Sequence, residues 1–246
     1  MEWEAPAIIL AVRPFGEGDA IATVMTAEHG AHRGLARGGS SRGRAALWQP
    51  GNLAQVRWVG RLAEQLGSLS GELVHPAAAL AMDDPLRLAM LIAACALAEG
   101  ALPEREAHPR LFDGLLSFIA RLAGGAGLLA EQVRWEALLL AELGFGLDLH
   151  SCPVTGATEG LVYASPKSGR AFTAEGAGKW ASRMLPLPAF LLGEGEGNPA
   201  QWRDGLRLTG HFLARDVFGL RHLPLPAARQ ALYDRVAGLA ELESDV

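Results

Sequence analysis

The sequence contains little cysteine and no long apolar segment. Its two cysteines, Cys95 and Cys152, do not form a CxxC motif, and two such residues cannot build a disulfide framework, which favours a reducing compartment. The longest uncharged apolar run, residues 88–98, is shorter than the roughly 20 residues that a membrane span needs. Residues 1–4 lack the basic region that opens a signal peptide. We therefore expect a soluble cytoplasmic protein.

The motifs of common enzyme classes are also absent. The sequence has no Walker A pattern, no GxSxG nucleophile elbow and no HExxH motif. A metal-dependent nuclease needs clustered carboxylates, and the available pairs are Asp83-Asp84 and Glu194/Glu196. The first pair is typical of a helix cap and the second of a flexible loop. We expect no enzymatic activity, and a nuclease or a small hydrolase remains the alternative.

Acidic residues are missing from one segment of the chain. Residues 29–63 contain six arginines and no Asp or Glu, so this segment has a formal charge of +6. Because the whole chain has a formal charge of −5, the other residues together carry −11. Phosphate binding responds to local clusters of cations, and arginine can direct two donors at one phosphate. The alternative is a solvated charged face, which normally mixes both signs. The segment therefore predicts a nucleic-acid contact.

The first 75 residues are typical of short strands joined by glycine-rich turns. We expect strands over residues 7–13, 20–26, 31–37, 53–59 and 64–73. Alternation in the fourth strand places Val56 and Trp58 in the core and Arg57 on the outer wall. The glycine-rich, basic segment 38–44 is expected to be an exposed loop. This pattern predicts a small five-stranded barrel.

The rest of the chain is rich in alanine and leucine and contains helix boundary signals. Asp84 followed by Pro85 is an N-cap with a first-turn proline. We expect helices over residues 85–97, 109–123, 128–143, 199–218 and 226–242. A hairpin is expected over 161–172. The fold class is therefore α+β, with a barrel domain over 1–78 and a helical domain over 79–246 that contains an insertion at about 148–178.

Two tryptophans lie among the arginines of the basic segment. Single-stranded nucleic acid is held by a basic groove together with aromatic faces on which bases stack, each worth about 1–3 kcal/mol. For Trp58 the alternation favours core packing. For Trp48, which lies in a turn region beside Gln49-Pro50-Gly51, stacking and packing are both left open.

His150-Ser151-Cys152 places two candidate metal ligands within three residues. A closed structural zinc site needs four nitrogen or sulfur ligands. No second Cys or His follows between residues 153 and 190, so metal binding is disfavoured.

Several segments resemble the RecO family of bacterial recombination-mediator proteins. They follow in the family's order and spacing over nearly the whole chain. The matching segments are residues 7–10 with Arg13, 15–19, 26–30, 34–38, 49–51, 138–149 with Cys152, 165–169, and Arg229.

This resemblance implies an oligonucleotide-binding (OB) barrel followed by a helical domain. It implies binding of single- and double-stranded DNA, annealing of complementary strands and, with the partner RecR, loading of RecA onto DNA coated by single-stranded-DNA-binding protein (SSB), in the cytoplasm on the nucleoid. Zinc-bearing members have two CxxC pairs, whereas this chain has Cys152 with Thr155 where the second cysteine would fall. The resemblance therefore implies that the zinc is lost and that no cofactor is bound.

The expected DNA-binding residues are Arg13, Arg33, Arg37, Arg42, Arg44, Trp48, Arg57 and Arg61. The SSB tail ends in acidic and apolar residues, so its site should offer a cation beside an apolar face. We expect this cation to be Arg134, which precedes Trp135 at the start of an apolar helix face, with Arg121 as second choice. A structural adaptor that binds only proteins remains a further alternative.

Overall fold

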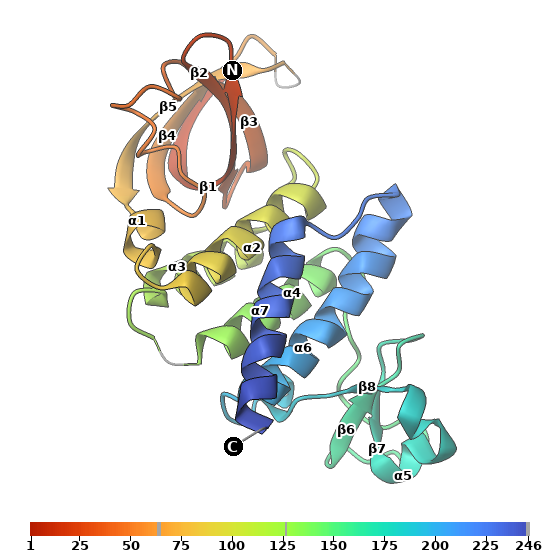
Figure 1. Ribbon diagram of the computed structural model, residues 1–246. Coiled ribbons are helices and arrows are strands. Elements are labelled where there is room, and N and C mark those ends of the chain that lie inside the picture. Colours follow the sequence, from red (N-terminus) through yellow and green to blue (C-terminus); the bar gives the residue numbers. More distant parts are fainter. Residues whose placement is uncertain (63–64, 126, 245–246) are drawn as a thin grey trace. The chain divides into compact units, whose positions relative to one another are not determined.

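The computed structural model describes residues 1–62, 65–125 and 127–244 (Figure 1). The chain forms two compact units, Met1–Gly125 and Ala126–Val246. Within the described ranges, no helix combines the length and the apolar character needed to cross a membrane.

The first unit begins with a closed barrel whose strand order is β1-β2-β3-β5-β4 (Figure 1). Its strands are β1 (Glu2–Phe15), β2 (Asp19–Thr26), β3 (Gly30–Ala36), β4 (Leu53–Val59) and β5 (Gly67–His75). Neighbouring strands pair antiparallel, except for the parallel pair β3 and β5. This is the topology of an OB fold, so the expected architecture is confirmed. The expected start of the fifth strand at residue 64 lies outside the described residues.

The barrel core is built from the inward-facing residues of every strand. Trp58 is 1% exposed, as the alternation in β4 predicted, and its indole N–H donates to the Arg33 carbonyl at 3.1 Å. The ring lies against Gly67, where a Cβ atom would clash with the indole. Burial of Trp58 therefore requires Gly67 at the start of β5, because any larger residue would push the indole out of the core.

The same unit continues with α1 (Ala77–Ala81), α2 (Pro85–Ala101) and α3 (Pro109–Arg121). The Asp84 side chain caps α2 as expected, since it accepts the amides of Leu86 and Arg87 at 2.9 and 3.2 Å. The segment after α2 runs beside β3, where Glu104 forms a bridge with Ala31. This pairing places acidic side chains next to the barrel wall.

The second unit contains α4 (Leu128–Glu142), α6 (Pro199–Phe212) and α7 (Ala227–Ser244). A buried ion pair joins α4 to α7, with Arg229 Nε 2.6 Å from Glu136 Oε1. The helix expected over 199–218 is shorter, because α6 ends at Phe212 and continues as a π-helical turn, η3 (Leu213–Phe218), then as η4 (Gly219–Arg221). A wider turn of this kind is not visible in local helix signals.

A small lobe is inserted between α4 and α6 (Figure 1). It contains the expected hairpin of β6 (Leu161–Ala164) and β7 (Ala171–Thr173), to which β8 (Leu185–Pro186) adds in the order β7-β6-β8. Its short helical segments are α5 (Ala174–Ala177), η1 (Gly178–Arg183) and η2 (Ala189–Leu192).

Candidate nucleic-acid interface

The segment between β3 and β4 begins with a basic turn, residues 37–44, which we call the arginine loop. Its backbone is tied to the start of β2: the Gly38 amide donates to Asp19 Oδ1 at 2.7 Å, and the Ser40 hydroxyl donates to the Asp19 carbonyl at 2.8 Å. The Ser40 amide donates to the Gly18 carbonyl at 3.0 Å. The loop is therefore an anchored element of the barrel surface, as a preorganised binding site requires.

Three exposed arginines, Arg37, Arg42 and Arg44, project from this loop. Arg44 Nη1 donates to the Arg37 carbonyl at 3.0 Å. Across the ranges that the structure describes, none of the three has a carboxylate oxygen within 4.0 Å. Their positive charge is thus available to an external anion, and each guanidinium can donate to a phosphate.

A cavity of about 330 Å³ lies beside the loop. Arg37 and Arg44 line it together with apolar groups from Leu47, Trp48 and Leu69. The cavity is therefore a basic concavity with an apolar lining at the junction of β3, β5 and the arginine loop.

Two of the other predicted arginines, Arg13 and Arg33, form ion pairs with acidic side chains. Arg13 Nη2 lies 2.9 Å from Glu99 Oε1, and Arg33 Nε lies 2.9 Å from Glu104 Oε1. These two acids belong to α2 and to the segment that follows it. Exposed ion pairs are worth about 1 kcal/mol or less, so phosphate can compete for these arginines, but they are not free cations.

The two remaining predicted arginines lie on or next to β4. Arg57 Nε donates to Glu2 Oε1 at 2.7 Å across the β1–β4 pair. Arg61 is exposed just beyond the strand, beside residues 63 and 64, which lie outside the described part of the chain. The seven arginines predicted from the sequence therefore do not form one uniform basic surface.

The burial of the Trp48 side chain favours core packing over base stacking. It is 5% exposed and packs in the barrel core with Val56 and Trp58. The turn that follows the arginine loop folds inward, since the Asn52 side-chain amide donates to the Ala46 carbonyl at 2.8 Å. Trp48 is therefore a packing residue that lines the cavity, and its ring faces are not an exposed platform for bases.

The two cations expected at the SSB-tail site belong to different units. Arg121 is exposed in the last turn of α3. Arg134 Nε donates to the Phe190 carbonyl at 3.0 Å and Nη2 to the Gly195 carbonyl at 2.8 Å, with the guanidinium 5.7 Å from the Phe190 ring centroid. Arg134 therefore holds η2 and the loop after it against α4.

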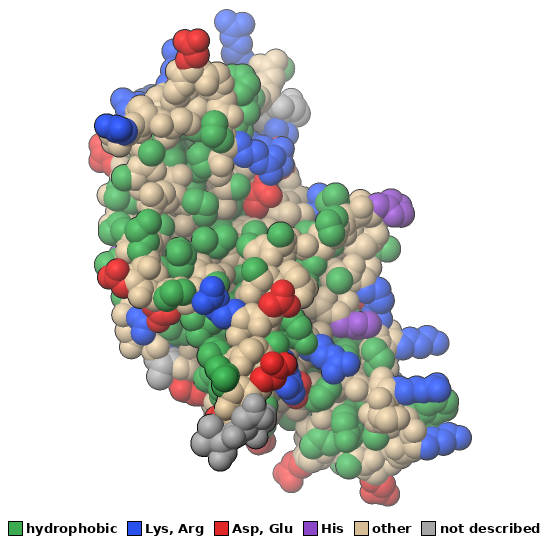
Figure 2. Space-filling model, viewed as in Figure 1, with side chains coloured by type: hydrophobic (Ala, Val, Ile, Leu, Met, Phe, Trp, Pro, Cys, Tyr) green, Lys and Arg blue, Asp and Glu red, His purple; other side chains and the backbone are tan. Residues whose placement is uncertain are grey.

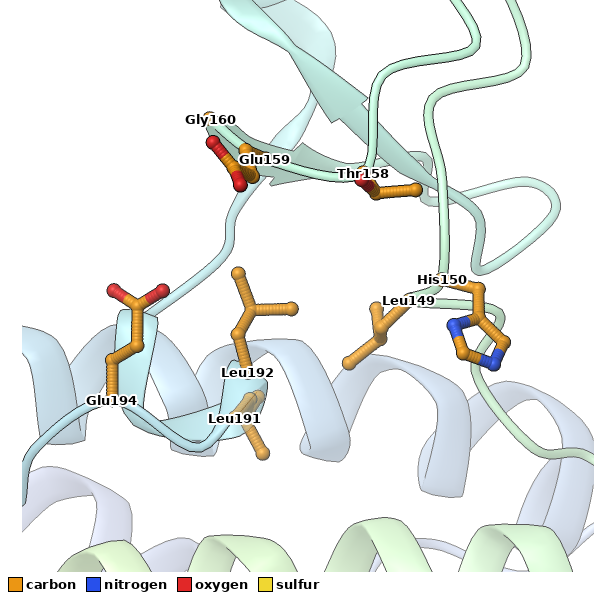
Figure 3. Close-up of a pocket in the computed structure, with 8 residues that line it drawn as sticks. All are labelled: Leu149, His150, Thr158, Glu159, Gly160, Leu191, Leu192 and Glu194. Atoms are coloured by element: carbon orange, nitrogen blue, oxygen red, sulfur yellow. The ribbon is translucent and has the colours of Figure 1, made fainter.

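A pocket of about 650 Å³ lies in the second unit (Figure 3). Leu149, Leu191 and Leu192 give it an apolar side, and Glu159 and Glu194 stand at its edges (Figure 3). The two carboxylates would repel an acidic peptide, so this pocket has the wrong charge for an acidic tail.

A second pocket of about 230 Å³ lies between α6 and α7. Its apolar lining includes Leu206, Leu225 and Tyr233, and the exposed Arg207 stands beside them. This is a cation next to an apolar surface, the chemistry expected for the tail. The sequence does not single out Arg207, because a single arginine on an amphipathic helix has no local pattern that distinguishes it from a solvated charge.

Cys152 is buried in a cage of hydrogen-bond donors. Desolvation raises the pKa of its thiol, but donors from the Thr155 hydroxyl and from the amides of Thr155, Thr173 and Val154 outweigh this effect and lower the pKa to about 6. The Thr173 hydroxyl also lies 3.7 Å from the sulfur.

This donor set does not fit a structural zinc ion. Zinc in such sites takes four Cys or His ligands, and the turn provides one thiol with threonine hydroxyls. Over the described ranges, no three His, Cys, Asp or Glu side chains come together as a metal site. The hydrogen-bond donors around Cys152 favour its thiolate form.

The closed barrel, its anchored arginine loop and the following helices place the chain in the class of OB-fold proteins. Two family models match it: "Recombination protein O N terminal" over residues 1–77 and "Recombination protein O C terminal" over residues 82–224. The chain belongs to the RecO family of DNA repair proteins.

Similar proteins extend over the same length. A protein named DNA repair protein RecO from Granulibacter bethesdensis is 58% identical over 100% of this chain and 99% of the relative. Proteins of the same name from Acidiphilium cryptum and Gluconacetobacter diazotrophicus are 58% and 54% identical, over 96% and 97% of this chain and 96% of each relative. The resemblance found in the sequence is thus confirmed, and with it a role in DNA repair and recombination.

Proposed function

We propose that this chain is a non-enzymatic DNA-binding recombination mediator that works in the cytoplasm on the nucleoid. The observation that carries the proposal is the set of three arginines, Arg37, Arg42 and Arg44, which have no acidic partner in the described chain and project from a loop anchored to an OB barrel. Such a surface contacts phosphates and does not read bases, so binding should be independent of sequence.

Strand annealing follows from the same electrostatics. Two complementary single strands repel one another through their phosphates, and arginines that neutralise phosphates lower that repulsion. Binding to double-stranded DNA needs only the same phosphate contacts. We infer that single strands, double strands and the annealing intermediate all bind at the arginine loop.

The test is fluorescence anisotropy with a labelled single-stranded oligonucleotide over a range of salt concentrations. Each neutralised phosphate contributes about −0.7 to the slope of log affinity against log salt. Arg37→Gln, Arg42→Gln and Arg44→Gln should each make the slope shallower by about that amount. Arg235→Gln on α7, which removes the same charge from an exposed position, is the matched control. Unchanged slopes in all three loop variants would contradict the assignment.

Protein partners form the second part of the proposal. With RecR, the chain would help RecA to load onto single-stranded DNA coated by SSB. The support is family membership, and the test is RecA loading on SSB-coated DNA with each component omitted in turn. Loading that proceeds equally well without this chain would refute the role.

For the SSB tail we propose Arg134, with Arg121 second. The pocket beside Arg207 is a specific competitor, because it combines an exposed cation with an apolar lining. A labelled peptide of acidic and apolar residues should bind Arg134→Ala more weakly than wild type. If Arg207→Ala weakens binding and Arg134→Ala does not, the tail binds the pocket between α6 and α7.

The absence of enzymatic activity is likewise proposed. Asp84 is engaged as the α2 cap, which leaves Asp83 without the partner carboxylate that a metal-dependent nuclease would use. Incubation of labelled DNA with the protein and magnesium or manganese is expected to leave the DNA intact. Cleavage that copurifies with the chain would favour the nuclease alternative, and the lack of any DNA binding would favour the protein-only adaptor.

A further inference from the structure

One tryptophan of the chain is exposed on the lobe of the second unit. Trp180 is 51% exposed and lies in η1. In contrast, Trp48, Trp58 and Trp135 are each at most 5% exposed. An indole ring that contributes little to a core and remains in water is a feature of binding surfaces, where an aromatic face meets a ligand.

Two cations lie over the face of this ring in cation–π contact. Lys179 Nζ lies 5.5 Å and Arg183 Cζ 5.4 Å from the Trp180 ring centroid. Both side chains are exposed, and within the described ranges neither lies within 4.0 Å of a carboxylate. No ion pair within the described residues therefore neutralises the positive charges of Lys179 and Arg183.

The segment from β6 to β8 contains more cations than acids. Residues 161–186 contain four cations and one acid, Glu175, for a net charge of +3 in a chain whose net charge is −5. Figure 2 shows Lys and Arg side chains along one edge of the part that holds β6, β7, β8 and α5. The segment that holds Trp180 thus has a local excess of positive charge, although the whole insertion between α4 and α6 contains five acids and four cations.

The ring and its cations are held by the lobe's own framework. Trp180 and Arg183 are three residues apart, and residues at this spacing lie on the same face of a 3-10 helix. After η1 the chain is fixed by Leu185, which pairs with Ala164 in the β6–β8 ladder, and the Met184 amide donates to the Ala181 carbonyl at 3.1 Å. The backbone that carries these three side chains is therefore fixed by the lobe itself.

We propose that Trp180, Lys179 and Arg183 form a second contact for single-stranded nucleic acid, separate from the barrel. Lys179 and Arg183 would turn from the ring to the neighbouring phosphates, and one base would stack on the indole face that they leave. This inference rests on the proposed DNA-binding function and extends it to the second unit.

Single-stranded nucleic acid fits the three residues better than an acidic peptide does. A nucleic-acid strand alternates flat bases with negative charges, which matches a ring accompanied by two cations. A peptide carboxylate would use the cations and leave the indole without a flat partner. Double-stranded DNA keeps its bases stacked inside the helix, so the ring would contribute little to binding it.

The test uses the full-length protein, a labelled oligothymidylate of about 20 nucleotides, which is longer than the site of one OB fold, and a duplex of the same length. Trp180→Leu should weaken single-strand binding about five-fold or more, as expected for the loss of one stacked base. Trp180→Phe should restore most of the affinity, and duplex binding should change much less. Leu220→Ala, which removes another exposed apolar side chain of the second unit, is the control.

Two further measurements separate stacking from general electrostatics. The double variant Lys179→Gln/Arg183→Gln should reduce the magnitude of the salt slope by about 1.4, the contribution of two phosphates. Stacking should also quench tryptophan fluorescence in wild type, and the part of the quenching that is lost in Trp180→Phe belongs to Trp180.

The outcomes distinguish this inference from the proposed function. If Trp180→Leu binds the oligonucleotide as wild type does while the arginine-loop variants fail, the barrel is the DNA site and the lobe contact is refuted. If wild type binds no oligonucleotide at all, the proposed function itself falls. If Trp180→Leu loses affinity for an acidic peptide of Asp and Phe but retains the oligonucleotide, the lobe is a peptide site and the inference is wrong.

Discussion

The buried ion pair between α4 and α7 gives the strongest stability prediction. Glu136 and Arg229 are 0% and 1% exposed. Arg229 approaches both carboxylate oxygens, at 2.6 and 2.9 Å, and the Thr209 hydroxyl donates to Oε2 at 2.5 Å. Arg229 Nη2 also donates to the Leu206 carbonyl at 2.7 Å. Three helices of the second unit therefore meet at one charged group.

Glu136→Ala would leave a guanidinium buried with only neutral acceptors. Removing one partner of a buried pair costs about 3–5 kcal/mol, because the remaining charge stays out of water. Typical unfolding free energies are about 5–15 kcal/mol, so this loss is a large fraction of the total. Replacing both charges by apolar groups, as in Glu136→Leu/Arg229→Met, removes the uncompensated ion, so the double variant should be less destabilised than Glu136→Ala.

Urea unfolding followed by circular dichroism measures these differences. Glu241→Gln, which changes an exposed acid on the same helix as Arg229, should have little effect. A cost below about 1 kcal/mol for Glu136→Ala, or a double variant at least as unstable as the single one, would refute the reasoning, since either result means that the buried charge is not the dominant contribution. Arg229 also lines the pocket beside Arg207, so tail-peptide binding should be measured on the same variants.

Three further predictions concern the barrel and the lobe. Burial lowers the pKa of His32 from its ordinary value of 6.5. As the pH falls, the unfolded chain therefore binds a proton at His32 before the folded chain does, and the free energy of unfolding should decrease below about pH 6.5. His32→Gln should flatten this part of a profile of melting temperature against pH. Gly67→Ala should lower the melting temperature through its clash with Trp58, whereas Gly43→Ala, which has open space, should not. Elemental analysis of protein purified without chelators should find no stoichiometric zinc, and one zinc per chain retained by wild type but not by Cys152→Ser would overturn this expectation.

Local patterns predicted most of the fold because they act over a few residues. Alternation in β4 placed Trp58 inward, and the Asp84-Pro85 pair located the start of α2, since each depends only on neighbouring positions. The π-helical turn after Phe212 was not predicted, because its wider spacing depends on how the helix packs against the rest of its unit.

The functional residues were predicted less completely. The basic segment predicted the arginine loop, but the sequence left stacking and packing equally open for Trp48, and burial in the core decided for packing. Trp180 with Lys179 and Arg183 had no distinctive pattern in the sequence, because exposure of an aromatic ring is a property of the folded lobe.

The sequence by itself determined the strand and helix order, the family and the concentration of arginine in one segment. Only the tertiary structure decided which arginines keep their charge available: Arg13 meets Glu99 across 86 positions of the chain, whereas Arg42 meets no acid in the described residues. The physical reason is range, since charge composition is a local count, whereas the partner of each charge depends on residues that folding brings together.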